Sequence, residues 1–350
     1  MKKKLLLLIA ILVLTLVVID GWVLSQSTIN FEDKEDISIA ITGDVMLGRK
    51  MPSVLNEGSP FRNVADIVSN VDLLLINLEN PATNSPTAYK SLVPLKMDPQ
   101  YLNLAKANNN TVAALANNHI GDYGEVGLND TIKLLEENGF YYTGAGNNID
   151  EATKPVVTDI KGRQVVILNY MDQDNFKEFS QTDIPKSDEN SSGYAPIDWN
   201  IIEKDLSKYN ESADIIIVYL HYGNEYSRSP NENQEDISKK LIDNGADIVV
   251  GAHAHVTQGI EIYKDKPIFY NLGNFIFDQE RSDTHRGMFL KLDLINDTCE
   301  ITVYPIYING YIPEYMSSEN GKILLNELIP KTDAMTITEN GTGKLSFKLD

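Results

Sequence analysis

The stretch IIIVYLHYGNE, residues 215–225, joins a wholly apolar run to a histidine and a glutamate. Ile215–Leu220 has the length and the β-branched content of a buried strand, and His221 follows at once. Strands that are apolar throughout need cover on both faces. The pattern therefore predicts an α/β fold with two sheets packed together, helices on the outside, and a histidine at one strand end.

Other strand-like runs end in the same way, with polar side chains that can bind a metal. These side chains are Asp44, Glu79, Asn118 with His119, and His253 with His255. In open α/β sheets, ligands bind beyond the carboxyl ends of the strands. Neutral imidazoles and carboxylates are the ligands of Zn, Mn or Fe. The sequence thus predicts a metal centre, holding one or two such divalent ions, at the rim of a sheet.

Each of these residues also has an ordinary interpretation when it is taken alone. An aspartate at a strand end is commonly a turn or cap residue, and a single histidine is commonly structural. His253 and His255 are a stronger signal, because residues i and i+2 of a strand-like segment point the same way. The complete set is specific, since several independent explanations would otherwise have to coincide.

Composition limits the function classes. The 350 residues can form one large domain or two ordinary ones, and the formal net charge is -20. Such an acidic surface argues against nucleic acid as a partner and against broad adhesion to anionic lipid. The single cysteine, Cys299, excludes an intrachain disulfide and is expected to be a small buried hydrophobe.

The N-terminus predicts a membrane anchor. Lys2–Lys4 precede an apolar stretch, Leu5–Leu24, of roughly 20 residues, which is enough to span a hydrocarbon layer about 30 Å thick. The lysines would stay cytoplasmic. We favour an uncleaved signal anchor over residues 1–26 and a linker over 27–36, although a cleaved signal is the alternative. In either case the main domain lies outside the cell. With the uncleaved anchor the chain would be a single-pass membrane protein.

The remaining pattern divides into two parts. Strands alternate with helices in the first half, and hairpins are predicted later, around residues 156–168, 258–271 and 288–307. We place a main domain over 37–310. A helix and a strand in 311–350 are expected to pack on the same domain.

Several motifs together resemble the bacterial poly-γ-glutamate capsule-synthesis family (CapA/PgsA-like), within the calcineurin-like metallophosphoesterase superfamily. The motifs appear in family order and are Gly43–Arg49, Asn77–Glu79, Asn117–His119 with Asp122, His221–Glu225, Gly251–Val256, and Leu272–Phe275. The resemblance implies a four-layer α/β/β/α sandwich around a two-metal site.

The resemblance also implies residue roles. Asp44 and His255 would bind the first metal, and Glu79 would bridge. The second metal would be held by Asn118, His221 and His253. His119 would be the general acid, oriented by Asp122. The substrate would be bound by Arg49, Asn77, Glu225 and Asn274.

Two positions depart from the superfamily pattern, although the capsule family shares them. Met46 stands where the superfamily has a histidine, and a thioether is a poor ligand for a hard or borderline ion. Glu79 stands where the superfamily has a bridging aspartate, so its reach is longer. The first metal site is expected to be weaker, and the departures weaken the inference of phosphatase activity without weakening the family match.

Three functions remain open. The first is a membrane-anchored extracellular component of poly-γ-glutamate or related polymer synthesis and export, working with membrane-bound synthase or export subunits on an anionic polymer. The second is an extracellular metal-dependent phosphoesterase that acts on a phosphoester and has no capsule role. The third is a non-catalytic binding module on the same fold.

Overall fold

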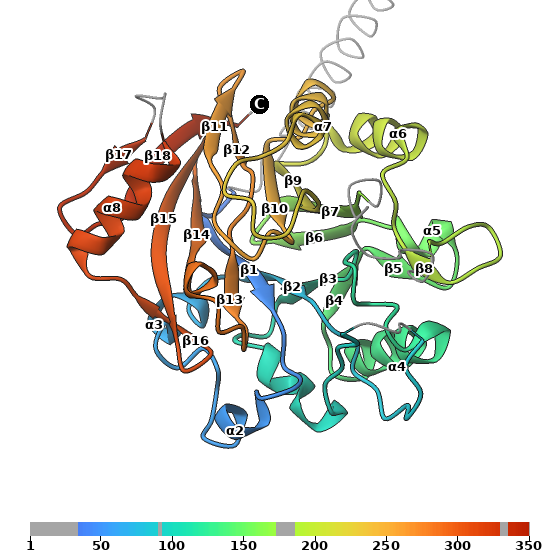
Figure 1. Ribbon diagram of the computed structural model, residues 1–350. Coiled ribbons are helices and arrows are strands. Elements are labelled where there is room, and N and C mark those ends of the chain that lie inside the picture. Colours follow the sequence, from blue (N-terminus) through green and yellow to red (C-terminus); the bar gives the residue numbers. More distant parts are fainter. Residues whose placement is uncertain (1–33, 90–92, 173–185, 330–334, 350) are drawn as a thin grey trace, which may run out of the picture. The chain divides into compact units, whose positions relative to one another are not determined.

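The computed structural model describes residues 34–89, 93–172, 186–329 and 335–349 (Figure 1). The predicted anchor and nearly all of the predicted linker lie outside these residues. From Glu35 onward the chain forms one compact unit. Within the described ranges, none of the helices combines the length and apolar character needed to cross a bilayer.

The larger of two main sheets has ten strands, and the part from β1 to the edge strand β4 is parallel. The parallel strands are β1 (Ile37–Val45), β2 (Leu73–Leu78), β3 (Thr111–Ala114) and β4 (Tyr141–Thr143). Antiparallel strands continue the sheet beyond β1, in the order β14 (Arg286–Ile295), β15 (Thr298–Asn309), β18 (Gly343–Lys348) and β17 (Thr336–Ile337). Two more strands pair with β1 and β15, namely β13 (Asn274–Ile276) and β16 (Ile312–Tyr315).

The second sheet has six strands in the order β11-β12-β10-β9-β7-β6. Its parallel centre consists of β7 (Arg163–Met171), β9 (Ile215–His221), β10 (Ile248–Ala252) and β12 (Lys266–Phe269). The edge strands β6 (Val156–Ile160) and β11 (Ile260–Tyr263) are antiparallel. The three predicted hairpins are therefore confirmed as β6–β7, β11–β12 and β14–β15.

The two sheets pack face to face through alternate residues of their strands. Ile39 and Ile41 of β1 belong to the same buried cluster as Ile215 and Ile217 of β9. Their neighbours in sequence, such as Ala40 and Ile216, belong to a second cluster that includes the helices. This alternation follows from the pleat, which turns successive side chains to opposite faces. It explains why these strands are apolar throughout.

Helices α4 (Gly124–Glu137), α6 (Trp199–Tyr209) and α7 (Glu232–Asp243) cover the outer faces of the sheets (Figure 1). Another long helix, α8 (Ser318–Leu328), packs on the inner cluster instead. Shorter elements are α2 (Pro52–Leu55), α3 (Ala65–Val68), α5 (Ile149–Ala152), the 3₁₀ turns η1 (Pro99–Ala105) and η3 (Ser282–His285), and the pair β5 (Ala145–Gly146) and β8 (Gly193–Tyr194).

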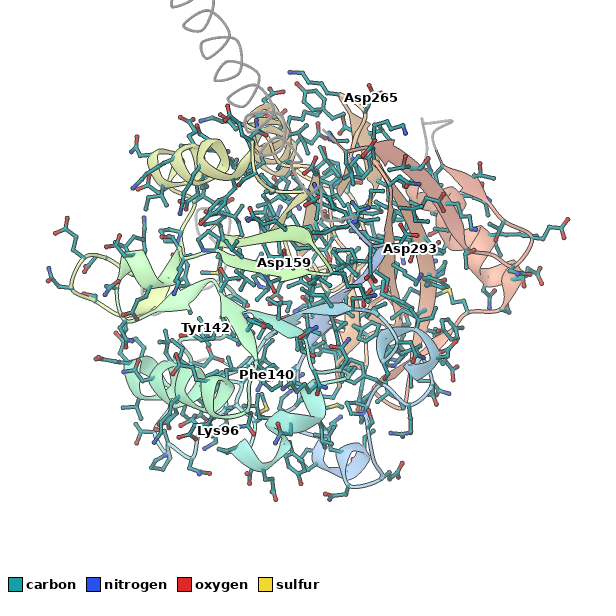
Figure 2. The ribbon with its side chains drawn as sticks, turned by 180° about the vertical axis from the view of Figure 1, so that it is seen from behind. Lys96, Phe140, Tyr142, Asp159, Asp265 and Asp293 are labelled. Carbon is teal, nitrogen blue, oxygen red and sulfur yellow. The ribbon has the colours of Figure 1, made fainter. Side chains whose placement is uncertain are left out.

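The C-terminal segment completes the larger sheet rather than forming a separate unit. Strand β18 pairs with β15, and α8 inserts Leu324, Leu325 and Leu328 into the cluster between the sheets. Cys299 of β15 is fully buried in that cluster, which confirms the expectation of a small buried hydrophobe. Figure 2 shows the exposed Asp159 and Asp265 on the outside of the molecule, where part of the acidic charge lies.

A glycine allows the strand end that carries Asp44 to approach a neighbouring loop. A Cβ atom on Gly43 would lie 1.9 Å from the carbonyl oxygen of Gly273. Instead, the N–H of Asp44 donates to that oxygen at 3.1 Å. Substitution of Gly43 would push apart the two segments that frame the end of β1.

Truncation of the interface between the sheets should reduce stability strongly. We expect Ile217→Ala to lower the free energy of unfolding by about 2–5 kcal/mol, because it removes buried methyl groups and leaves a cavity. The matched control is Ile323→Ala on α8, where the side chain is 51% exposed and a change within about 0.5 kcal/mol is expected. Chemical denaturation measures both, and equal losses would contradict a core between the sheets.

Candidate metal centre

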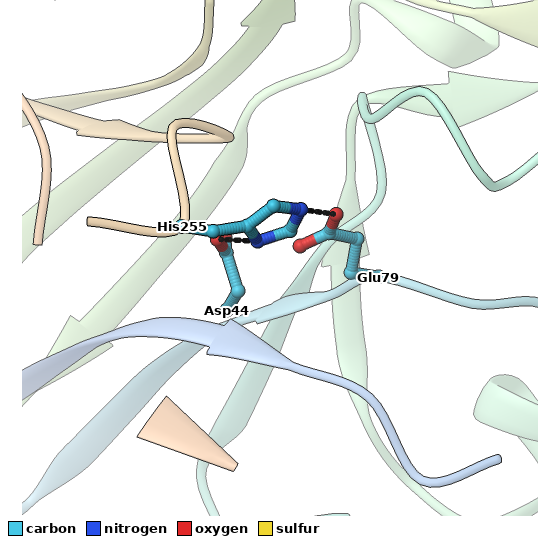
Figure 3. A group of neighbouring side chains, drawn as sticks. All are labelled: Asp44, Glu79 and His255. Atoms are coloured by element: carbon cyan, nitrogen blue, oxygen red, sulfur yellow. Dashed lines mark ion pairs between the residues drawn. The ribbon is translucent and has the colours of Figure 1, made fainter. Parts of the chain in front are cut away.

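Asp44, Glu79 and His255 form a buried group at the carboxyl ends of strands (Figure 3). Asp44 lies near the end of β1, Glu79 directly after β2, and His255 in the turn that follows β10. Nδ1 of His255 is 3.2 Å from Oδ2 of Asp44, and its Nε2 is 3.7 Å from Oε1 of Glu79. One ligand atom of each residue lies within 4.8 Å of the others. Two carboxylates and an imidazole at this spacing can hold a divalent cation.

A second group lies beside the first and is made of His221, His253 and Asn118. Nε2 of His221 is 3.1 Å from Nδ1 of His253 and 3.0 Å from Oδ1 of Asn118. All three residues are buried. Three atoms that carry lone pairs therefore converge on one point, which is also a suitable donor set for a cation.

The amide of Asn77 connects the two groups. Its Nδ2 donates to Oδ1 of Asp44 at 2.8 Å, and lies 3.4 Å from Oε2 of Glu79 and 3.4 Å from Nδ1 of His221. Its Oδ1 accepts from Asn117 at 3.2 Å. The sequence interpretation placed Asn77 at the substrate. The structure places it fully buried beside both carboxylates, where its amide can orient them, and the substrate role stays a prediction.

Asn274 was also assigned to the substrate, and it too lies within the packed site. Its Oδ1 is 2.9 Å from Nδ1 of His255, and its Nδ2 donates to Gln279 at 3.0 Å and to the carbonyl of Thr284 at 3.3 Å. Two acceptors, from Asn274 and Asp44, thus face Nδ1 of His255. They favour the tautomer with the proton on Nδ1, which leaves Nε2 as the ligand atom.

His253 and His255 lie in a turn and not in an extended segment, so the reason given for their convergence was wrong. Strand β10 ends at Ala252, and both histidines have positive φ, 93° for His253 and 58° for His255. Left-handed backbone is rare in residues other than glycine and is common at functional sites. The turn directs the two imidazoles to different groups, His253 to His221 and His255 to Asp44.

His119 and Asp122 form a dyad next to these groups. Nδ1 of His119 is 2.6 Å from Oδ2 of Asp122, and the same oxygen accepts from the N–H of Leu95 at 2.6 Å. The Oδ1 of Asn117 accepts from the N–H groups of His119 and Ile120, which fixes the turn after β3. Asp122 thereby orients the imidazole through Nδ1, so that Nε2 is the nitrogen suited to proton transfer.

The surroundings shift several pKa values. Burial raises the pKa of Asp44, but the hydrogen bond and charge of His255 outweigh it, and the pKa lies below its usual range. Burial lowers the pKa of His255, but the hydrogen bond and charge of Asp44 bring it above its usual value. Burial, with His221 and His255 nearby, holds the pKa of His253 well below its usual value. The contact between Asp44 and His255 thus favours the charged form of each, whereas the surroundings of His253 favour its neutral form.

Met46 is fully buried and belongs to the hydrophobic cluster that includes the helices. Its sulfur accepts from the N–H of Gly48 at 3.0 Å.

Arg49 and Glu225 lie at the outer side of the centre. The side chain of Arg49 forms an ion pair with Asp278 and is 34% exposed. Its guanidinium also lies over the ring of Phe277. Glu225 is half-buried and acts on His255 through its charge. Both residues remain candidates for contact with a substrate.

Two positioning residues were missed by the sequence analysis. Tyr219 of β9 donates its hydroxyl to the carbonyl of Thr42 on β1 at 2.8 Å, which joins the two sheets beneath the site. Asn169 of β7 accepts from the N–H of Ala116 at 2.7 Å and donates to the carbonyl of Tyr219 at 3.0 Å. The available signal was a polar atom in an otherwise apolar strand, which requires a specific partner.

The chain is similar to proteins of capsule synthesis. Residues 38–279 match the family described as bacterial capsule synthesis protein PGA_cap. The capsule biosynthesis protein CapA of Bacillus anthracis is 30% identical over 336 residues, which cover 92% of this chain and 80% of that protein. The PGA biosynthesis protein CapA of Bacillus subtilis is 32% identical over 324 residues, covering 90% and 83% respectively.

A similar solved structure is a hypothetical protein from Thermus thermophilus. It is 14% identical, and the alignment covers 79% of this chain and 96% of that one with a TM-score of 0.45.

Metal affinity should rise with pH. Burial lowers the pKa of His255, but the hydrogen bond and charge of Asp44 hold it above its usual value, and a cation must displace the second proton before Nε2 can bind it. We expect the Kd for Mn²⁺ to fall by up to about tenfold per pH unit below the pKa of His255 and to level off above it. Calorimetric titration across this range measures the slope. His119→Gln, which changes an imidazole outside the ligand groups, should keep the slope, and a flat Kd in the unaltered protein would contradict the ligand role of His255.

Proposed function

The chain belongs to the bacterial capsule synthesis protein family PGA_cap, and from this premise we propose that it serves poly-γ-glutamate synthesis or export through a buried metal centre. Two relatives that cover most of the chain are named for capsule and PGA biosynthesis, which supports the polymer. The observation that carries the proposal is the convergence of Asp44, Glu79 and His255 from three distant strand ends.

We propose that the protein is a single-pass membrane protein whose main domain lies outside the cell. Lys2–Lys4 and the apolar run Leu5–Leu24 support this topology. Its partners would be the membrane-bound subunits that synthesise or export the polymer. An extracellular domain with one anchor would hold the site close to the point where the polymer emerges.

The residues present fit a divalent cation, which we take to be Mn, Zn or Fe. Asp44, Glu79 and His255 would hold one ion, with Glu79 bridging to a second ion at Asn118, His221 and His253. A bound cation would lower the pKa of a water molecule and polarise the bond under attack. Both donor sets support this assignment. The ligand atoms of Asp44, Glu79 and His255 lie within 4.8 Å of one another, and Nε2 of His221 lies 3.1 Å from Nδ1 of His253 and 3.0 Å from Oδ1 of Asn118.

The other side chains would act on the substrate or on the ligands. His119, held by Asp122, would donate a proton from Nε2 to the leaving atom. Asn77 and Asn274 would fix the carboxylates and the tautomer of His255. Arg49 and Glu225, at the outer side, would contact the substrate.

A second candidate is an extracellular phosphoesterase with no capsule role. The His119–Asp122 dyad, 2.6 Å apart, favours it, because an oriented acid has a purpose only if a bond is broken. Met46, a thioether where the superfamily has a histidine, argues for a weaker metal site and against efficient hydrolysis. A non-catalytic module would need neither the dyad nor the ions.

Loss of the metal centre should abolish polymer at the cell surface. In a host that makes poly-γ-glutamate, we expect deletion of the gene to remove surface polymer. The unaltered gene should restore it, whereas Asp44→Asn should not, because an amide cannot supply the charge that the cation requires. Asp159→Asn on the exposed edge of β6 is the matched control and should restore polymer fully. Full restoration by Asp44→Asn would argue against a functional metal.

Substitution of His119 should separate the effect on catalysis from the effect on metal binding. We expect His119→Ala to lower turnover of an aryl phosphate by about 10²–10⁴ while the Kd for Mn²⁺ is unchanged, because His119 is a proton donor and not a ligand. His285→Ala changes the one histidine outside the clusters and should leave both quantities unchanged. The two measurements are steady-state kinetics and metal titration. Equal turnover in the unaltered protein and His119→Ala would exclude a hydrolytic role for the dyad.

A further inference from the structure

Two arginines each lie over an aromatic ring, and each of these rings lies beside His255, one of the candidate metal ligands. The guanidinium of Arg281 lies 4.7 Å from the ring centre of Tyr226, and that ring lies 6.0 Å from the ring of His255. The guanidinium of Arg49 lies 5.5 Å from the ring centre of Phe277, which packs edge-on against His255 at 4.9 Å. Three loops, after β1, β9 and β13, therefore bring these arginines and rings to the outer side of His255.

Tyr226 is held in this position by its backbone and its neighbours. Its φ of 61° is in the left-handed region, which is unusual for an aromatic residue and occurs at functional sites. Its N–H donates to the carbonyl of Ala254 at 2.8 Å, within the turn that carries His255. The residue is 37% exposed, so it faces both the histidine and the solvent.

A circuit of contacts couples Tyr226 to His255 a second time. The hydroxyl of Tyr226 accepts from Nε2 of Gln279 at 3.5 Å, and Oε1 of Gln279 accepts from Asn274 at 3.0 Å. Asn274 in turn contacts Nδ1 of His255 at 2.9 Å. A group bound at Tyr226 would therefore have a fixed position relative to the metal ligand.

Arg281 keeps donors for a further anion. Asp283 accepts from Nε at 2.7 Å and from Nη2 at 2.9 Å, which holds the guanidinium in one orientation. A guanidinium has five N–H donors, so Nη1 is not used by this pair. The side chain is 57% exposed. The net charge of the protein is -20, so most of its surface repels an anionic ligand. An oriented guanidinium at the outer side of His255 is suited to binding such a ligand locally.

We propose that Tyr226 and Arg281 form an anion-binding lip that seats one carboxylate of a polyanionic chain beside His255, with Arg49 available to a second carboxylate. The proposal rests on the proposed function and adds to it the residues that select the substrate. Repeated carboxylates along a flexible chain match two guanidinium groups on either side of one histidine. Tyr226 and Arg281 would thus hold the substrate in position, and neither residue is a metal ligand.

Binding of a short γ-linked glutamate oligomer to the full-length protein tests this proposal. We expect Arg281→Gln to weaken binding by about tenfold or more, because hydrogen bonds to charged groups contribute most among polar contacts. The Kd for Mn²⁺ should stay unchanged. Tyr226→Ala should weaken binding similarly, whereas Tyr226→Phe keeps the ring beneath the guanidinium and should retain most of the affinity. Arg62→Gln removes the same charge from another carboxylate-paired surface arginine and is the matched control.

The outcomes separate the lip from the function. A loss of affinity in Arg281→Gln but not in Arg62→Gln, absent for a neutral γ-linked glutamine oligomer, would support the proposal. Equal and small effects of both arginine variants would overturn it, and the polymer role would then be judged by whether Arg281→Gln still restores surface polymer. No binding of the oligomer to the unaltered protein would overturn the lip and the choice of polymer together, while leaving the metal titrations intact.

Discussion

The central physical constraint is the burial of two carboxylates, those of Asp44 and Glu79, next to each other. Two negative charges removed from water are costly unless cations and hydrogen-bond donors face them. His255 and Asn77 face these carboxylates with N–H groups, and both are themselves fixed by further residues. A cation held by the same carboxylates would offset their burial further, and the group has the spacing to hold one.

The site depends on how two sheets meet. β1, β2 and β3 deliver their polar ends from one sheet, and β9 and β10 deliver theirs from the other. Apolar packing sets the distance between the sheets, but it does not fix their lateral position. Directional bonds do so, from Tyr219 to Thr42 and from Asn169 to Ala116, directly below the ligands. Stability of the core and geometry of the site are therefore linked.

An acidic protein that handles an anionic polymer needs a local exception to its own charge. Arg49, paired with Asp278, and Arg281, paired with Asp283, place two cationic groups at the outer side of the centre, where the carboxylate of Glu225 also lies. The paired aspartates weaken the attraction of the two arginines for an anionic chain. They also hold the planar guanidinium groups in place over aromatic rings. A fixed donor is better suited to selecting a repeating chain than a freely moving one.

The sequence by itself determined the strands, the hairpins, the family and the set of side chains at the strand ends, because apolar periodicity and short motifs are local properties. The family resemblance implied how these side chains divide, with His255 beside Asp44 and Glu79 and His253 beside His221 and Asn118, and only the tertiary structure decided the distances and contacts between them. It also placed Asn77 and Asn274 in contact with these side chains, which the sequence did not predict. The physical reason is that side chains from strand ends far apart in the chain meet through the packing of two sheets. In addition, the left-handed turn at His253 and His255 breaks the alternation from which their directions would otherwise be inferred.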